Sequence, residues 1–429
     1  MGKYQRAKGT HDLYPGAPAW EDDSVRWNVV ENAFRELCFL FGYSEVRTPV
    51  FESTDLFKRT IGEETDIVSK EMYTFQDQGG RSLTLRPEGT APTLRAYVDS
   101  PLSTQSGVAK MYYITSVFRY ERQQRGRYRQ HQQLGVEAIG SEDPALDAEV
   151  IQMAMMFFRK IGIKNLTLKI NSVGSIASRA GYLSALKAYV EPFLGEFSAE
   201  GQGRFAANPL RLLDTKNVRE LEILSDAPRL KDFLADDESA HFNSLTGILT
   251  SLGITYTVDP YLVRGFDYYT KTAFEIQSPD LGAQNALGGG GRYDKLVGEI
   301  GGNPAPGIGF GLGVERALIA LQAIGAEQAI PDGPRVFVVT QGDAARAPAF
   351  QLLSRLREHN IASDMDYSSR NMKAQMRTAD RTRAEFAAII GDDEAEQHTV
   401  QLKNLASREQ VTLPIDNVVS YLTEAGSHA

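Results

Sequence analysis

Two strand-like runs in this sequence flank a short polar turn and predict a long β-hairpin. The runs are VAKMYYITSVFRY (108–120) and RYRQHQQLGVEAI (127–139), and the turn between them is RQQRG. Strand-type runs on both sides of a short glycine-containing turn are the usual signal of such a hairpin. Five arginines lie within eleven positions around the tip: Arg119, Arg122, Arg125, Arg127 and Arg129. The fold must therefore accommodate a strand pair whose turn carries concentrated positive charge.

This local charge contrasts with the formal net charge of the chain, which is −9. Guanidinium groups bind phosphate oxygens through paired hydrogen bonds and stay charged at any physiological pH. Arg125, Arg127 and Arg129 alternate, so in a strand they would project from one face. From the residues alone, the hairpin tip is either an anion-binding site or a solvated strand edge that discourages aggregation.

The bulk properties predict a globular protein of several domains. A length of 429 residues allows roughly two to four domains. No apolar run approaches the roughly 18 residues that a membrane span requires, and no apolar stretch follows the basic N-terminus as in a secretory signal. A single cysteine, Cys38, excludes an internal disulfide, and no Cys/His cluster has the spacing of a metal site. We therefore expect a cytoplasmic protein without a structural metal.

The rest of the chain alternates between helical and strand-like segments. Residues 20–42 carry apolar residues at three- and four-residue steps and predict an amphipathic helix. A second helix is predicted over 145–161, because Asp143 resembles an N-cap and a proline follows it. Residues 172–255 look like a helical insertion. After a linker at 329–335, the last unit alternates β- and α-type segments.

Two motifs offer groups that could contact a ligand. TLRPEGTAPTLR (84–95) places Glu88 and Thr90 at a turn that leads towards a helix, where they could face an ammonium group. The alternative for this motif is a plain helix start with an acidic first turn. LVRGFDYYTKTAFEI (262–276) supplies Arg264 and two phenolic hydroxyls from one loop, and ordinary core aromatics are the alternative.

Glycine-rich sequence follows in NALGGGGRYDKLVG (285–298) and PGIGFGLGVERALIAL (306–321). Successive glycines permit a ligand to approach the backbone closely. Neither stretch is a Walker A loop or a dinucleotide-binding turn, because the residues and context that those motifs require are missing. GIGFGLG is typical of a central strand and runs into a helix that carries Glu315 and Arg316. The glycine strand and Arg316 would form a floor and a clamp for a nucleotide; alternatively, the Glu-Arg pair lies on the surface.

The order of these motifs resembles that of one family. R-x-E before an arginine-rich turn, and a glycine strand ending in G-x-E-R, are similar to motifs 2 and 3 of class II aminoacyl-tRNA synthetases. The helix and strand that end at Pro49 resemble motif 1, the dimer element of that class. LRPEGT, LVRGFDYYT, GGGGRYDKL and the KGTHDLYPG start are similar to the hallmarks of histidyl-tRNA synthetases. The resemblance runs from about residue 7 to the C-terminus.

The resemblance implies an α+β catalytic domain on a mostly antiparallel sheet flanked by helices, formed by residues 1–171 and 256–328. Residues 172–255 would be the helical insertion, and 336–429 an α/β anticodon-binding domain. It further implies a homodimer formed through motif 1.

For ATP, the resemblance implies that Arg119 binds the α-phosphate and stabilises the charge that develops there. Glu121, Arg127 and Arg316 would hold adenine and the β- and γ-phosphates. Arg264 would be a second catalytic cation, opposite Arg119, and Mg²⁺ would accompany ATP. Such a site works by positioning and electrostatics, without a protein nucleophile.

For histidine, the resemblance implies a pocket that recognises each end of the amino acid. Glu137 and Tyr269 resemble the family's partners of the two imidazole nitrogens, and Tyr268 and Tyr293 would line the pocket. The α-ammonium group would be received by Glu88, Thr90 and Gln133. A site built to bind a polar group rejects analogues that lack it by about 10⁴-fold, so we expect no editing domain.

One position departs from the family pattern. His131, followed by Gln132, stands where the family commonly has a phenylalanine that stacks on adenine. A neutral imidazole is also planar, but the resemblance does not assign adenine stacking to His131. Arg122, Arg125 and Arg129 have no implied substrate; the tRNA acceptor end is the expected partner and solvent the alternative.

A locally basic helix is predicted in the C-terminal domain. Lys373, Arg377 and Arg381 share one helical face at i, i+4 and i+8. This face would contact phosphates of the anticodon arm or, alternatively, solvent.

The implied activity is that of a histidine–tRNA ligase. Histidine and ATP would give histidyl-adenylate and pyrophosphate, and histidine would then pass to the 3′ end of tRNA(His). The main alternative is the regulatory subunit of ATP phosphoribosyltransferase, a non-catalytic protein on the same fold, and a further one is an RNA-binding protein without chemistry. The presence of Arg119, Arg264, Arg316 and residues 335–429 favours the enzyme over both.

Overall fold

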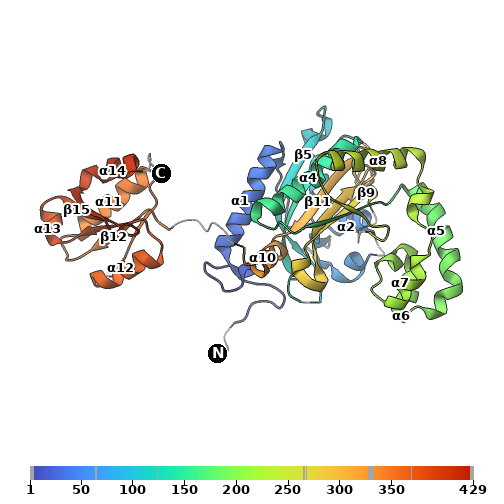
Figure 1. The fold of residues 1–429 in the computed structure, drawn as a ribbon, viewed down its shortest axis with the longest axis horizontal. Coiled ribbons are helices and arrows are strands. Elements are labelled where there is room, and N and C mark those ends of the chain that lie inside the picture. Colours follow the sequence, from blue (N-terminus) through green and yellow to red (C-terminus); the bar gives the residue numbers. More distant parts are fainter. Residues whose placement is uncertain are drawn as a thin grey trace. The chain divides into compact units, whose positions relative to one another are not determined.

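The chain folds into two compact units, Met1–Ala329 and Ile330–Ala429 (Figure 1). The computed structural model describes residues 4–62, 65–122, 124–263, 266, 268–326, 333–368 and 370–425.

An eight-stranded sheet forms the centre of the first unit, in the order β1-β5-β6-β11-β10-β9-β7-β8. From β5 to β7 every neighbouring pair is antiparallel, and the short edge strands β1 and β8 pair in parallel. This arrangement confirms the mostly antiparallel sheet. The strands are β1 (Ser44–Glu45), β5 (Ala109–Phe118), β6 (Gln130–Ile139), β7 (Thr167–Ser172), β8 (Thr257–Val258), β9 (Thr270–Gln277), β10 (Ala286–Arg292) and β11 (Gly307–Gly313).

Helices bury one face of this sheet, as the apolar spacing predicts. Helix α1 (Ser24–Leu40) packs with α4 (Pro144–Ile161), α8 (Asp236–Ser251) and α10 (Val314–Ala323) around a single apolar cluster (Figure 1). In α4 the side chain of Asp143 accepts a hydrogen bond from the Ala145 amide at 2.9 Å, which confirms the predicted N-cap. Helix α3 (Thr90–Val98) contacts β6 through the other face, where Leu94 packs with Met111 and Ile139.

The chain between β7 and β8 is helical. It contains α5 (Ile176–Val190), α6 (Ala199–Ala207), α7 (Val218–Ser225) and α8, together with shorter 3₁₀ segments. Figure 1 shows α5, α6 and α7 grouped beside the sheet, whereas α8 lies along α4. Leu245 and Leu249 of α8 belong to the apolar cluster under the main sheet, so the last helix of this region is part of that core.

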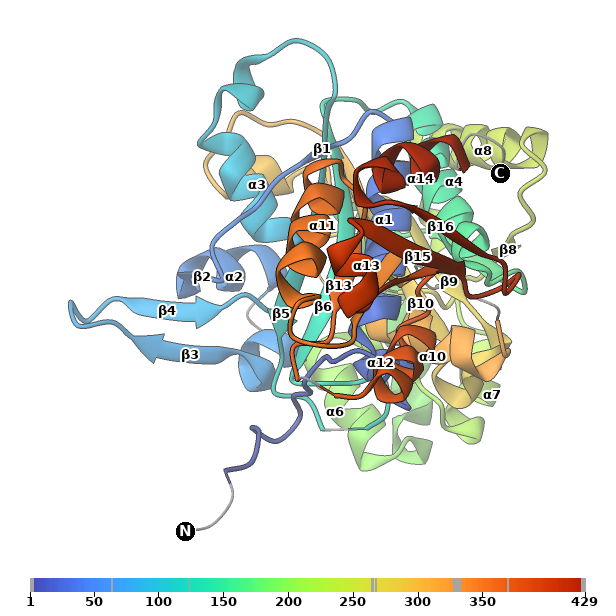
Figure 2. The ribbon, with the colours of Figure 1, turned by 90° about the vertical axis from the view of Figure 1, so that its left-hand side faces the viewer.

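A small sheet of β2 (Phe51–Ser53), β4 (Ser82–Leu85) and β3 (Tyr73–Gln76) follows α1 in the chain, with α2 (Thr54–Ile61) beside it. In Figure 2, β3 and β4 extend away from the main sheet as a hairpin. The remaining short helix of this unit, α9 (Leu296–Glu299), contacts α2 and α3.

The second unit is a five-stranded mixed sheet in the order β13-β12-β14-β15-β16. The strand-type runs of this unit, VFVVT (336–340), AAII (387–390) and VTLPI (411–415), correspond to β12, β14 and β16, while β13 and β15 are additional strands. Its elements are β12 (Val336–Thr340), α11 (Arg346–Glu358), β13 (Ser363–Met365), α12 (Met372–Arg381), β14 (Phe386–Ile390), α13 (Asp392–Glu396), β15 (Thr399–Asn404), β16 (Gln410–Pro414) and α14 (Val418–Ala425). Among the described residues of either unit, no helix has the length and apolar character needed to cross a bilayer.

Candidate active site

A cavity of about 430 Å³ opens on the sheet face opposite the large helical cluster. Its walls come from the β4–α3 turn, the β5–β6 hairpin, the segment before β9, strands β10 and β11, and the start of α10. Eleven of the predicted site residues line it: Glu88, Thr90, Arg119, Glu121, Arg127, Gln133, Glu137, Tyr268, Tyr269, Tyr293 and Arg316. The twelfth, Arg264, lies outside the described residues. The structure therefore brings together side chains that are spread over more than half of the sequence.

The glycines of β11 form a floor on which two side chains of β6 lie. A Cβ atom on Gly309 would come within 2.0 Å of Glu137 Oε2, and one on Gly311 within 2.1 Å of Gln133 Nε2. Both contacts are far below van der Waals separation, so any side chain at these positions would displace the β6 residues. The glycines at alternate positions of GIGFGLG thus have a physical cause. The positions of β11 that face the cavity must leave space for the side chains of β6 that lie on them.

For the activity that the sequence resemblance implies, replacing Gly311 by alanine is expected to raise the KM for histidine by about tenfold while leaving the KM for ATP within twofold. The new methyl group would displace Gln133, whose Oε1 atom now accepts a hydrogen bond from the Gly89 amide at 2.9 Å. Gly195→Ala is the control, because a Cβ atom there meets nothing within 4 Å. Pyrophosphate exchange at varied histidine and ATP measures both constants, and an unchanged histidine KM would contradict the role of the glycine floor.

Glu137 is fully buried between two tyrosine hydroxyls. Tyr113 Oη donates to Glu137 Oε1 at 3.2 Å, and Tyr293 Oη donates to Glu137 Oε2. Burial raises the pKa of the Glu137 carboxyl to about 8, although the hydroxyl groups that bind it favour the charged form. The pocket therefore contains a carboxyl group that titrates at about pH 8 and is bound by two tyrosine hydroxyls.

The raised pKa of Glu137 predicts a pH dependence of stability. Between an ordinary pKa of 4.5 and about 8, the folded protein holds a proton that the unfolded chain has released. The free energy of unfolding should therefore fall as the pH rises through this window, by at most ~1.4 kcal/mol per pH unit. The stabilisation from this bound proton is fully present below pH 4.5 and is lost above about pH 8. Urea unfolding across the window should show a weaker pH slope in Glu137→Gln; equal slopes in both proteins would refute the assignment.

Glu88 and Gln133 are held at the start of α3. The carboxylate of Glu88 accepts hydrogen bonds from the backbone amides of Thr90 at 2.6 Å and Ala91 at 2.7 Å. Glu88 lies one residue before the N-cap Gly89, so α3 does not have the acidic first turn of the plain alternative, and Glu88 also lines the cavity. One carboxylate, one hydroxyl and one amide side chain thus border the same end of the cavity, a combination suited to an ammonium group.

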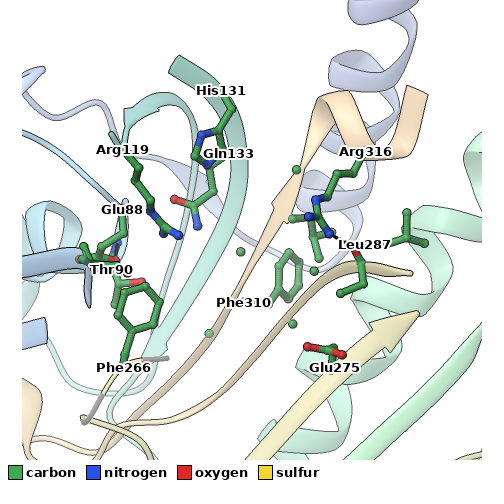
Figure 3. A pocket seen from close by; sticks show the side chains of 18 of the residues that line it. Glu88, Thr90, Arg119, His131, Gln133, Phe266, Glu275, Leu287, Phe310 and Arg316 are labelled. Atoms are coloured by element: carbon green, nitrogen blue, oxygen red, sulfur yellow. Dashed lines mark hydrogen bonds between the residues drawn. The ribbon is translucent and has the colours of Figure 1, made fainter. Parts of the chain in front are cut away.

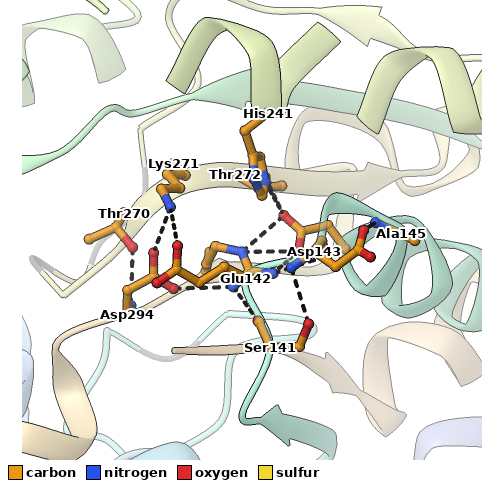
Figure 4. A network of polar contacts seen from close by, with 11 residues as sticks. Ser141, Glu142, Asp143, Ala145, His241, Thr270, Lys271, Thr272 and Asp294 are labelled. Carbon is orange, nitrogen blue, oxygen red and sulfur yellow. Dashed lines mark hydrogen bonds and ion pairs between the residues drawn. The ribbon is translucent and has the colours of Figure 1, made fainter. Parts of the chain in front are cut away.

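A buried ionic network supports the strand that leads to Tyr293 (Figure 4). Arg292 Nε donates to Asp147 Oδ1 at 3.0 Å, and His241 Nε2 lies 2.9 Å from Asp147 Oδ2. The hydroxyl of Thr272 also donates to Asp147. These contacts join α4, α8, β9 and β10, and they fix the end of β10 immediately before the tyrosine that contacts Glu137.

Cationic side chains enter the cavity from two sides. Figure 3 shows Arg119 beside Gln133 on one side and Arg316 on the other. Arg119 Nε donates to the Pro87 carbonyl at 2.7 Å, and Arg316 Nε donates to the Gly126 carbonyl at 3.2 Å. The second contact joins α10 to the hairpin tip. An anion between the two guanidinium groups would be approached from opposite directions.

The prediction that Arg125, Arg127 and Arg129 project from one face of a strand is wrong. Strand β5 ends at Phe118 and β6 begins at Gln130, so the three arginines lie in the turn, where their side chains diverge. The contacts are Arg125 Nε with Glu21 Oε1 at 3.2 Å, Arg127 Nη1 with Glu121 Oε2 at 3.5 Å, and Arg129 Cζ over the Tyr120 ring at 3.7 Å. Of the three, Arg127 lines the cavity.

His131 lines the cavity between the two arginines. Burial and the nearby charge of Arg119 lower the pKa of its imidazole to about 3, so the ring is neutral at physiological pH. Glu315 also lines the cavity and is buried, which excludes the surface alternative for the Glu-Arg pair of α10.

Several other cavity residues were not predicted. Phe266 stacks on Tyr268 at a centroid distance of 5.1 Å, and Glu71 and Glu275 add carboxylates to the walls. Glu275 could have been recognised from strand alternation, because it follows Ala273 by two positions in β9. Glu71 carried no such signal, since it lies in a short π-helical segment far from the other motifs.

In the second unit, Lys373, Arg377 and Arg381 are exposed on α12, opposite the buried Gln375 and Ala379. They do share one face. No group of acidic, histidine or cysteine side chains within the described part of the chain is arranged to hold a metal ion.

Comparison with known proteins identifies the family. The family model of histidyl-tRNA synthetase matches residues 19–317, and that of an anticodon-binding domain matches residues 335–425. The histidine–tRNA ligase of Bacillus velezensis is 47% identical over 98% of each chain, and that of Moorella thermoacetica is 48% identical over 97% of each. The crystal structure of apo S. aureus histidyl-tRNA synthetase, 42% identical, superposes with a TM-score of 0.81 over 98% of this chain and 99% of that one. The chain therefore belongs to the histidyl-tRNA synthetase family.

Proposed function

We propose that the cavity activates histidine with ATP and then transfers it to tRNA(His), the reaction of a histidine–tRNA ligase. The observation that carries this proposal is one cavity with arginines on two sides and a buried carboxyl–tyrosine cluster in its wall. Full-length identity of 47–48% to histidine–tRNA ligases supports the enzyme over a regulatory subunit of ATP phosphoribosyltransferase.

In the first step, a carboxylate oxygen of histidine attacks the α-phosphorus of ATP. The bond to the β-phosphate oxygen breaks, pyrophosphate leaves, and a mixed anhydride forms. In the second step, a terminal hydroxyl of tRNA attacks the carbonyl carbon, loses its proton and expels AMP. Neither step needs a protein nucleophile, so catalysis rests on alignment and on stabilising the charge around the α-phosphorus.

For ATP, we assign the α-phosphate to Arg119 and the triphosphate tail to Arg127 and Arg316. Glu121 supports this set, because it pairs with Arg127 at 3.5 Å. Arg264 is proposed as a further cation at the α-phosphate. Mg²⁺ enters as the counterion of the ATP substrate.

For histidine, we assign the imidazole to Glu137 and Tyr269, against Tyr268 and Tyr293. The ammonium group is assigned to Glu88, Thr90 and Gln133. With this orientation the carboxylate of histidine points towards the arginine side of the cavity.

Histidine-dependent exchange of pyrophosphate into ATP tests the first step, and charging of tRNA(His) tests the second. Robust exchange is expected without tRNA. Folded protein that shows no exchange would reject the enzyme and favour the regulatory alternative.

We further propose a cytoplasmic homodimer formed through α1 and the following strands. Its support is the apolar exposure of this region: Phe39 is 83% and Leu40 71% exposed at the end of α1. Exposed apolar residues that gather in one region of a surface mark interaction sites. The basic face of α12 is proposed to contact the anticodon arm.

A further inference from the structure

The sequence KGTHDLYPG has no role in the chemistry above, yet the structure holds it against the ATP side of the cavity. We define residues 7–23 as the N-terminal strap. The carbonyl of Gly9 accepts a hydrogen bond from the Arg129 amide at 2.7 Å, so the strap is joined to the backbone of the hairpin tip. Gly9 has a φ of +85°, and a Cβ atom there would lie 2.7 Å from Arg129 Cγ, so the two segments are in close contact.

The side chain of His11 is largely enclosed in this contact, with 8% of its surface exposed. Its ring stacks on Tyr128 of the hairpin tip, with centroids 4.7 Å apart and planes inclined by 14°. Nδ1 lies 2.6 Å from Asp22 Oδ1, and Nε2 lies 3.6 Å from Glu315 Oε1. The ring of Trp27, from α1, meets it edge-on at 5.9 Å. The imidazole therefore lies between two carboxylates.

Glu315 connects His11 to the cavity. Its Oε1 atom accepts a hydrogen bond from the Gln132 amide at 2.9 Å, and it immediately precedes Arg316 in α10. Through this one carboxylate, His11 contacts both strand β6 and the helix that supplies an ATP-binding cation.

The C-terminal end of the strap contacts the hairpin tip and helix α10. Arg125 pairs with Glu21 at 3.2 Å, and Gln322 of α10 accepts a hydrogen bond from the Trp20 amide at 3.3 Å. Gln322 Nε2 in turn donates to the Pro18 carbonyl at 3.1 Å. Arg127 lies between the strapped positions 125 and 128. The strap thus contacts the tip at Arg125, Tyr128 and Arg129. Arg316, which lines the cavity, contacts the tip at the Gly126 carbonyl.

We propose that the N-terminal strap positions the arginine tip for ATP, and that His11, as an imidazolium, is the positioning residue that fastens it. This inference rests on the proposed function of the cavity. The mechanism is preorganisation: a tip already held in place loses less conformational freedom when the triphosphate binds.

The charges around His11 agree with this role. Burial would lower its pKa, but the hydrogen bonds and charges of Glu315 and Asp22 outweigh burial and raise it. The groups that face the ring are Asp22 of the strap, Glu315 of α10, Tyr128 of the tip and the uncharged Trp27 of α1. Because the pKa is raised, the fastened form is complete at low pH and is lost as the pH rises through the pKa of the folded protein.

The test compares the full chain with His11→Ala and His11→Gln in pyrophosphate exchange. We expect the KM for ATP to rise about tenfold and the KM for histidine to stay within twofold. The ratio of the ATP KM of His11→Gln to that of the wild type should fall as the pH rises above the ordinary histidine value of 6.5, and this ratio cancels the titration of ATP itself. His359→Ala, an exposed histidine of α11's C-terminal end, is the matched control. Equal rises in both KM values, an ATP KM within twofold of the wild type, or a ratio independent of pH would each overturn the proposal.

A second measurement is independent of catalytic activity. The chain has two tryptophans, Trp20 and Trp27, and both lie in or against the strap. A protonated imidazole beside an indole quenches its fluorescence, so emission of the wild type should increase in a titration step above pH 6.5 that is missing in His11→Gln. A wild-type protein without this step would refute the imidazolium, even where exchange activity is normal. A protein that shows the step but no exchange would refute the proposed function and leave the strap in place.

Discussion

Replacing Arg119 by alanine should lower kcat for histidine-dependent pyrophosphate exchange by about 10³-fold. The expected loss is large because negative charge increases at the α-phosphate as the histidine carboxylate attacks. The guanidinium is already oriented for this task, since Nε is anchored to the Pro87 carbonyl at 2.7 Å and its Cζ atom lies 5.6 Å from the centre of the Phe266 ring. Its terminal nitrogens extend into the cavity (Figure 3).

Two further variants test this assignment, one at Arg119 itself and one at a neighbouring arginine of the tip. Arg119→Lys keeps the charge but not the planar fork, so it should recover part of the rate and no more. Arg122→Ala removes an exposed arginine of the same hairpin tip and should leave exchange within twofold of the wild type. If Arg119→Ala and Arg122→Ala lost equal activity, the effect would belong to the overall charge of the tip, and the assignment of the α-phosphate would fail.

Glu137→Gln should lower kcat/KM for histidine by about 100-fold and leave the KM for ATP nearly unchanged. Binding of a protonated imidazole would favour the charged form of Glu137, and a hydrogen bond between charged groups contributes roughly 1.5–3 kcal/mol. Glutamine keeps the shape of glutamate but cannot acquire this charge. Tyr113 and Tyr293 both donate to this carboxyl in the unliganded cavity, so the substitution also presents one of them with an amide NH₂ instead of an acceptor.

The same exchange assay at varied histidine and at varied ATP gives both constants for Glu137→Gln. Glu299→Gln, an exposed position of α9, is the matched control and should behave as the wild type. Parallel losses for histidine and ATP would mean that Glu137 supports the cavity as a whole and does not read the imidazole.

The local elements of this fold follow from the sequence because their causes are local. Helix α4 begins where an aspartate cap and a proline place it, and the β5–β6 hairpin forms where two strand-type runs meet a glycine-containing turn. The glycine strand β11 was also predictable, but the reason for its glycines was not. That reason is the register Gly309↔Glu137, which is a contact between distant parts of the chain.

The fate of the arginines shows the same limit. Arg119 and Arg127 could be assigned through the order of the motifs, whereas the partners of Arg125 and Arg129 depend on where the N-terminal strap passes. Nothing in the strap's own sequence indicates that it crosses the hairpin tip. His11 lies in the KGTHDLYPG start, but that stretch gives it no role, and its significance depends on a stacking contact with Tyr128 that only the assembled structure reveals.

The central sheet also sets an order for the maturation of the nascent chain on the ribosome. Strand β6 ends at Ile139, but its partner β11 begins only at Gly307, after the helical region and four other strands (β7 to β10) have been synthesised. Until then the open edge of β6 has no native partner, and exposed edges of this kind are the usual starting points of misassembly. A translation product that stops before Gly313 therefore lacks the floor of the cavity and also the strand that joins β6 to β10. Such truncated products should be among the more aggregation-prone forms of this chain.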